Sequence, residues 1–126
     1  MSRSVISTVK APAAIGPYSQ AISVNGLLFI SGQLPIDPAD GKIVEKTIGT
    51  KTEQILVNAR EIAKEAGLTL NNVVKTTIFL TDLGDFQEVN EAYAKYFPEN
   101  PPARSTVQVA ALPLGSNIEI EFILST

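Results

Sequence analysis

The sequence Ile118-Glu119-Ile120-Glu121-Phe122 alternates apolar and acidic side chains, which is typical of a β-strand with two unlike faces. We expect its apolar face to pack against helices and its carboxylate face to meet either solvent or another subunit. We predict that this strand covers residues 117–124 and that it belongs to a sheet with helices on one side only.

Upstream of this strand, the Asn25-Gly26 pair predicts a β-hairpin between residues 19–24 and residues 27–31, because both residues accept the positive φ of a tight turn. Apolar side chains then recur at helical spacing along residues 48–66. We therefore predict a first helix there. It should end in a left-handed cap at Gly67, a residue that adopts this conformation at no steric cost.

The second half of the chain predicts two further strands and one helix. Residues 73–80 are rich in β-branched side chains, which favour a strand. Asp85 and Glu88 have the spacing of a capping box, so we predict a second helix that begins there and is closed by Pro98. A further strand follows over residues 105–110.

This order of elements predicts a single α+β domain over residues 1–126, in which two helices pack on one face of a mixed sheet. Two helices cannot cover both faces of such a sheet. In residues 27–30 and 78–80, apolar side chains also occur at both odd and even positions, which point to opposite faces of a strand. We therefore predict that the second face is partly buried in a homo-oligomer.

Composition excludes several classes of function. The chain has 126 residues, a net charge of −3, no cysteine and no histidine. A thiolate nucleophile, a catalytic imidazole and zinc sites of the usual kind are therefore excluded. The scattered lysines and acidic balance predict no nucleic-acid partner. No apolar run is long enough to cross a membrane, and we expect a cytoplasmic protein.

Arg104, in the run Asn100-Pro101-Pro102-Ala103-Arg104-Ser105-Thr106, is the leading candidate for a ligand-binding residue. Two prolines stiffen the backbone before it, and a guanidinium can bind both oxygens of a carboxylate. A loop over residues 112–116 joins the strands that begin near Arg104 and Glu119, and one interpretation is that the two side chains are neighbours in a hydrolytic pair. The alternative is an ordinary cross-strand ion pair. In either case the guanidinium would keep Glu119 ionised.

Three other candidates each have a structural alternative. Tyr18 follows a turn and would line a pocket or cap the sheet, and Ser31 ends a strand beside Gly32, as either a ligand contact or a turn residue. Asn90 lies beside the buried stripe of the second helix, where its amide would bind a ligand or satisfy loop backbone. The loop aspartates Asp37 and Asp40 fit turn formers better than metal ligands.

Taken together, these segments resemble the reactive-intermediate deaminase family, the Rid (RidA/YjgF) imine and enamine deaminases. The resemblance runs almost end to end. It is carried by Ala11-Pro12-Ala13-Ala14-Ile15-Gly16-Pro17-Tyr18-Ser19-Gln20, Ile30-Ser31-Gly32-Gln33-Leu34-Pro35, Glu65-Ala66-Gly67-Leu68, Val74-Lys75-Thr76-Thr77-Ile78-Phe79-Leu80, Phe86-Gln87-Glu88-Val89-Asn90, Pro102-Ala103-Arg104-Ser105-Thr106 and Ile118-Glu119-Ile120-Glu121.

The resemblance implies a chorismate-mutase-like α+β fold and a homotrimer whose sheets face inward, with active sites in the clefts between subunits. It implies a 2-iminobutanoate/2-iminopropanoate deaminase. Such an enzyme hydrolyses 2-aminoacrylate, 2-iminobutyrate and related products of pyridoxal-phosphate enzymes to 2-keto acids and ammonia. Its ligands are small imino and keto acids, and no metal or organic cofactor takes part.

Carried over residue by residue, the resemblance assigns substrate carboxylate binding to Arg104 and activation of the attacking water to Glu119. Substrate binding is also implied for Tyr18, Ser31, Asn90 and Thr106. Position 106 departs from the many family members that have cysteine there. Threonine keeps the backbone N–H at this position but rules out a role for a thiol.

Two other functions stay open at this stage. A sensor or carrier would bind small carboxylates in the same clefts without turning over the imine. A ribonuclease or translation inhibitor, a function attached to some relatives of the family, is disfavoured by the acidic balance, the three arginines and the absence of histidine.

Overall fold

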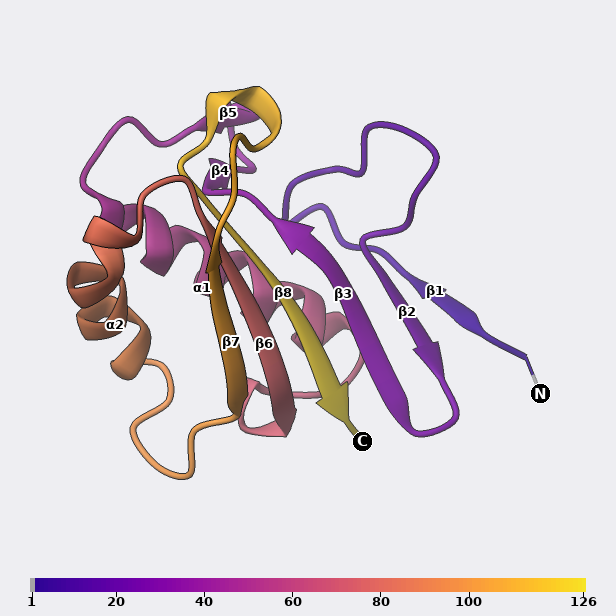
Figure 1. The fold of residues 1–126 in the computed structure, drawn as a ribbon. Helices are drawn as coiled ribbons and strands as arrows, with labels where there is room; N and C mark the ends of the chain where they lie inside the picture. Colours follow the sequence, from indigo (N-terminus) through magenta and orange to yellow (C-terminus); the bar gives the residue numbers. More distant parts are fainter. Residues whose placement is uncertain (1) are drawn as a thin grey trace.

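Six strands form one sheet in the order β1-β2-β3-β8-β6-β7 within residues 2–126, the part of the chain that the computed structural model describes (Figure 1). Met1, the first residue of the predicted domain 1–126, lies outside this part. The sheet strands are β1 (Ser4–Ile6), β2 (Ala21–Val24), β3 (Leu27–Gln33), β8 (Ile118–Ser125), β6 (Val73–Leu80) and β7 (Ala103–Gln108). A small separate hairpin comprises β4 (Ile36–Asp37) and β5 (Lys42–Ile43).

The C-terminal strand β8 lies in the interior of the sheet, between β3 and β6. It pairs antiparallel with β3 on one side and with β6 on the other. Ile118, Ile120 and Phe122 are buried on the helix side, whereas Glu121 on the opposite side is exposed. Only β7 runs parallel to its neighbour β6, so the prediction of a mixed sheet is confirmed.

The hairpin between β2 and β3 is built on the predicted Asn25-Gly26 turn. Asn25 has φ 52° and Gly26 has φ 78°, the left-handed pair that matches the twist of the flanking strands. Further along β3 the register with β8 shifts between Ile30 and Gln33. The shift has a role in the site, because it falls beside Glu119.

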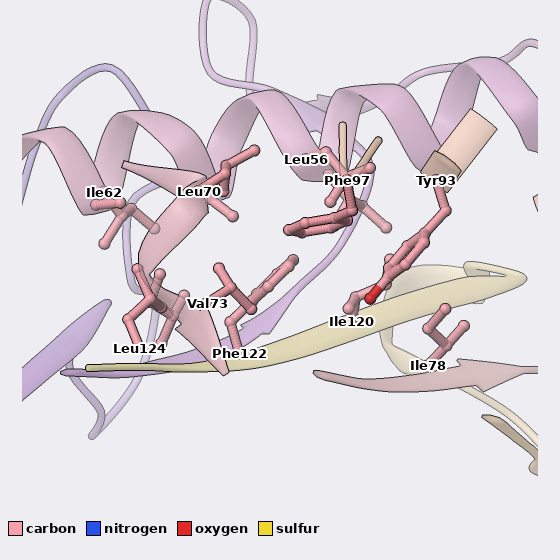
Figure 2. Packing of buried hydrophobic residues seen from close by; sticks show 14 of the residues in the cluster. Leu56, Ile62, Leu70, Val73, Ile78, Tyr93, Phe97, Ile120, Phe122 and Leu124 are labelled. Atoms are coloured by element: carbon pink, nitrogen blue, oxygen red, sulfur yellow. The ribbon is translucent and has the colours of Figure 1, made fainter. Parts of the chain in front are cut away.

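Helix α1 (Ile48–Glu65) and helix α2 (Phe86–Ala94) cover the same face of the sheet (Figure 1). Between helices and sheet lies the core, in which Leu56 and Ile62 of α1 pack toward Phe122 and Leu124 (Figure 2). The predicted end of α1 is confirmed. Gly67 has φ 78°, and the next backbone N–H, of residue 68, donates to the carbonyl of residue 63 at 2.8 Å.

The predicted capping box at the start of α2 is wrong. Asp85 has helical backbone angles and its side chain makes no capping hydrogen bond. A short 3-10 turn, Leu83–Asp85, precedes the helix, and Asp82 caps that turn through the N–H of Gly84 at 2.8 Å. The Glu88 carboxylate instead accepts from the N–H of Gly49 at 3.0 Å and so ties α2 to the first turn of α1.

Several strands also differ from the sequence predictions. The strand predicted over residues 105–110 is β7, Ala103–Gln108, so Arg104 lies inside a strand and not in the loop before it. Strand β1 and the β4–β5 hairpin were not predicted, because each is only two or three residues long. Asp37 and Asp40 accept from loop N–H groups at 2.9 Å, which confirms their role as turn formers.

The face of the sheet away from the helices is apolar in part and is uncovered in the single chain. Phe29 on β3 is 40% exposed and Val107 on β7 is 41% exposed. This face matches the predicted second face of the sheet. Across residues 2–126, no helix combines the length and the hydrophobicity needed to pass through a bilayer.

Candidate functional site

Arg104 and Glu119 lie on opposite faces of the sheet. Arg104 is level with Thr76 of β6, whereas Glu119 is level with Phe79 of the same strand. Side chains three positions apart on a strand point to opposite faces, so the guanidinium is on the helix side and the carboxylate on the uncovered side. The strands β7 and β8 flank β6 and do not touch each other as neighbours. Both the predicted pair within one chain and the alternative ion pair are therefore wrong.

The Arg104 guanidinium rests on two aromatic rings of α2. Its central carbon lies 5.0 Å from the Tyr93 ring centre and 5.4 Å from the Phe86 ring centre. Such contacts favour a cation over the face of a ring and restrict where it can move. The one ion pair among residues 2–126 is Lys95–Glu53 at 3.2 Å, so no carboxylate of this part of the chain neutralises Arg104.

A pocket of about 470 Å³ opens beside Arg104, and Asn90, Tyr93, Phe97 and Pro102 contribute to its walls. The Asn90 side-chain oxygen is buried and has no hydrogen-bond partner in residues 2–126. The structural alternative, an amide satisfying loop backbone, is therefore wrong for this oxygen. A buried acceptor without a partner is costly and uncommon, so it marks a place where an outside donor would be stabilised.

Thr106 lies two positions beyond Arg104 in β7 and faces the same side of the sheet. Its hydroxyl is buried and, like the Asn90 oxygen, lacks a partner within the described residues. The structure thus brings Arg104, Asn90 and Thr106 to the same side of the molecule, where β7 meets α2. This is one half of the predicted set.

Glu119 lies in a second pocket, of about 690 Å³, on the uncovered face. Its lining is mostly apolar and includes Ile15, Leu34, Ile36 and Leu114. Burial raises the pKa of the Glu119 carboxyl, and the charge of Glu121 adds to the rise. The prediction that Arg104 keeps Glu119 ionised is therefore wrong for the single chain, because the guanidinium is on the other face.

Tyr18 and Ser31 belong to this second pocket. Tyr18 is 53% exposed. The Ser31 hydroxyl donates to the Ser19 carbonyl at 2.6 Å, and the Ser31 N–H donates to the Gln20 carbonyl at 2.9 Å. Ser31 thus holds the loop that carries Tyr18. Its hydroxyl proton is already engaged, which leaves its oxygen free only to accept.

Sequence reasoning missed three features of the two pockets. Phe86 and Tyr93 were assigned only to the core, although their rings also support Arg104. Leu114 has a left-handed backbone, φ 57°, and is 72% exposed at the pocket of Glu119. Gly32 lies against the Glu119 carboxylate. The Leu114-Gly115 pair was read only as part of a loop, and nothing in the spacing of Gly32 indicates its contact.

The fold and the two pockets define a class of α+β protein in which one mixed sheet has a pocket on each of its two sides. The sequence model of the family described as Endoribonuclease L-PSP matches residues 8–125. The chain belongs to this family, which is the Rid family that its motifs resemble.

The similarity covers nearly the whole chain. The chain is 58% identical in sequence to the chloroplastic Reactive Intermediate Deaminase A of Arabidopsis thaliana, over 98% of this chain and 66% of the plant protein. It is 54% identical to the 2-iminobutanoate/2-iminopropanoate deaminase of Homo sapiens, over 96% of this chain and 88% of the human one. The structure of YyfA from Yersinia pestis, of the conserved Rid protein family, is 50% identical, with a TM-score of 0.96 over 99% and 100% of the two chains.

Proposed function

We propose that this chain is a 2-iminobutanoate/2-iminopropanoate deaminase, which hydrolyses small 2-imino acids and their enamine tautomers to 2-keto acids and ammonia. The observation that carries the proposal is the unneutralised guanidinium of Arg104, held on aromatic rings in a pocket with a free buried acceptor. Its chemistry fits a small anion that carries a carboxylate and an N–H donor. The names of the plant and human relatives agree with this substrate class.

Arg104 would bind the substrate carboxylate through both oxygens, which fixes the orientation of the imine carbon. The aromatic rings beneath the guanidinium reduce the freedom that it loses on binding. The Asn90 oxygen is then available to accept from the substrate N–H, and Thr106 offers a hydroxyl and a backbone N–H beside it.

Glu119 would act on the attacking water. As a carboxylate it takes a proton from water while the water oxygen bonds to the carbon of the protonated imine, which gives a neutral carbinolamine. The protonated carboxyl then gives that proton to nitrogen. As the C–N bond breaks and the C=O bond forms, the carboxylate takes the proton of the carbinolamine hydroxyl and later releases it to solvent, and ammonia and the keto acid leave. Burial raises the pKa of the Glu119 carboxyl, which makes the carboxylate a stronger base for the attack of water.

A complete site then requires two copies of the chain, since one copy presents Arg104 and Glu119 on opposite faces. We propose a chorismate-mutase-like homotrimer in which the uncovered sheet faces point inward. Arg104, Asn90 and Thr106 of one subunit would meet Glu119, Tyr18 and Ser31 of the next. The half-exposed Phe29 and Val107 of the uncovered face support this arrangement, because assembly would bury them.

Mixing two inactive variants tests the proposal. Arg104→Ala and Glu119→Gln each remove one half of the site. After the two proteins are unfolded and refolded together in equal amounts, about a quarter of the clefts combine an intact Arg104 with an intact Glu119. We therefore expect about a quarter of wild-type 2-iminobutyrate hydrolysis, measured with threonine dehydratase as the source of the imine. Activity no higher than that of the separate variants would contradict a shared site.

A small-carboxylate sensor and a ribonuclease make different predictions in the same samples. A sensor would bind 2-ketobutyrate and leave the spontaneous rate of imine hydrolysis unchanged. The family description names an endoribonuclease, but the net charge is −3 and Arg104 is the only cation lining either pocket. RNA cleavage that Arg104→Ala abolishes would favour the ribonuclease over the deaminase.

A further inference from the structure

Gly32 of β3 is packed directly against the carboxylate of Glu119. A Cβ added to Gly32 would lie 2.7 Å from the Glu119 Oε2 and 2.8 Å from its Cδ. Both distances are shorter than carbon makes without a clash. The Cγ would be 3.2 Å away, so the methyl group would meet the side chain along much of its length. No other glycine among the described residues meets a carboxylate outside its own loop this closely.

Backbone conformation does not explain the glycine at this position. Five glycines of residues 2–126 have a positive φ, which side chains avoid, and Gly32 is not one of them. An alanine would fit the backbone of Gly32 but not the space in front of it. A side chain at this position therefore has no room while the Glu119 carboxylate keeps its present place.

The local shape of β3 brings Gly32 to Glu119. Between Ile30 and Gln33 the strand advances three residues, while its partner β8 advances only two, from Phe122 to Ile120. The extra residue makes a bulge, and bulges change the direction in which neighbouring groups point. Here the bulge sets the bare backbone of Gly32 beside the carboxylate, in the same pocket wall as Tyr18.

We propose that Gly32 is a positioning residue for Glu119. Because Gly32 has no side chain, the Glu119 carboxylate can lie directly against the Gly32 backbone. This contact keeps the carboxylate inside the apolar pocket and directed at the bound imine. The inference rests on the proposed role of Glu119. A methyl group on Gly32 would push the carboxylate out by about 1 Å, a displacement that costs on the order of 100-fold in rate.

A double-mutant cycle measures how far the effect of Gly32→Ala on kcat/KM depends on Glu119. In the wild-type background, Gly32→Ala should lower kcat/KM for 2-iminobutyrate about 100-fold. Glu119→Asp shortens the side chain by one methylene and withdraws it from the added methyl, so in that background the same change should cost less than about threefold. An equal loss in both backgrounds, or no loss in the first, would overturn the inference.

A matched control is Gly49→Ala, which places a methyl 3.2 Å from the Glu88 carboxylate, and neither Gly49 nor Glu88 lines either pocket. Glu88 accepts from the Gly49 N–H, so the pair tests a glycine–carboxylate contact without catalytic consequence. We expect kcat/KM to change less than about threefold. A loss as large as that of Gly32→Ala would show that the effect is general, and would overturn the inference.

Titration of the Glu119 carboxyl by ¹³C NMR provides a readout that does not need activity. Gly32→Ala should move the carboxyl into water, and its pKa should fall toward the ordinary value for glutamate, while Gly49→Ala leaves it unchanged. An unchanged pKa in Gly32→Ala would overturn the inference even if the chain proved inactive. A wild-type protein without imine hydrolysis but with this pKa change would instead contradict the deaminase proposal alone.

Discussion

Arg104 shows how the surroundings of a single residue make a surface charge a candidate binding group. In the printed sequence it is one of three arginines, and a solvated charge is the ordinary expectation for such a residue. The structure adds two aromatic rings beneath it, and no carboxylate of residues 2–126 forms an ion pair with it. That Arg104 is a candidate ligand-binding residue could be predicted from the sequence. The aromatic support could not be predicted, because it depends on contacts between β7 and α2.

The planar fork of Arg104 should matter more than its charge. Lysine at this position keeps the charge but loses the bidentate contact and much of the stacking on the rings. We expect Arg104→Lys to lower kcat/KM for 2-iminobutyrate about 10- to 100-fold, which corresponds to a contact worth about 1.5–3 kcal/mol. Arg60→Lys, a change in the exposed part of α1, is the control. Wild-type kinetics for Arg104→Lys would refute the clamp.

The pH dependence of the reaction should report the raised pKa of Glu119. Activity is lost as pH falls through this pKa, because protonation removes the base. The negative charge of Glu121 contributes to the rise, so Glu121→Gln should lower the pKa and shift the acid limb of the kcat/KM profile to lower pH. A shift in the other direction would contradict the assigned cause.

At the scale of elements, most of the fold was predictable, because long elements have strong local patterns. The residue ranges of β6 and α1 follow directly from β-branched composition, helical spacing and a glycine cap. The start of α2 was mispredicted, because Glu88 forms a hydrogen bond with another helix instead of with its own N-terminus. The faces of Arg104 and Glu119 were mispredicted for a similar reason. Strand order, which places β6 between β7 and β8, is a long-range property that no local spacing reveals.

Asn58 connects α1 to the wall of the Glu119 pocket. Its buried side chain donates to the Ile36 carbonyl at 2.9 Å and to the Leu34 carbonyl at 3.4 Å, and both residues line that pocket. Asn58→Ala should lower the free energy of unfolding by about 1–3 kcal/mol, because it removes the side-chain donor to the Ile36 carbonyl, whereas the Leu34 carbonyl keeps the Ile36 N–H as a donor at 2.8 Å. Urea denaturation at one protein concentration measures this. Exposed Asn71→Ala is the control, with a change below about 0.5 kcal/mol.

At the scale of the whole molecule, the uncovered sheet face is the feature that one chain leaves unexplained. The alternation in β8 and the two-sided apolar pattern of neighbouring strands predicted an uncovered second face, and the structure has it. The trimer itself stays a proposal, which rests on the family resemblance and on the division of the site between the two faces.

A charge on the uncovered face should separate the subunits. Phe29→Asp places a carboxylate among the apolar side chains that assembly would bury. We expect sedimentation to give a mass near the 13.5 kDa of one chain, against about three times that mass for the wild type. Circular dichroism should remain that of a folded protein, and imine hydrolysis should be lost. Val9→Asp, at an exposed loop residue, should keep the larger mass. A fully active Phe29→Asp monomer would refute the shared site.

The placement of Arg104 and Glu119 on opposite faces also has a consequence for inheritance. In the proposed ring of three, each copy lends its guanidinium to one cleft and its carboxylate to another. A chain that folds normally but lacks both groups would therefore silence two clefts belonging partly to healthy copies. In a cell that makes both forms, such a change would behave as a dominant lesion. A change that prevents folding would instead keep the mutant copies out of the trimers, so the clefts between healthy copies would remain active.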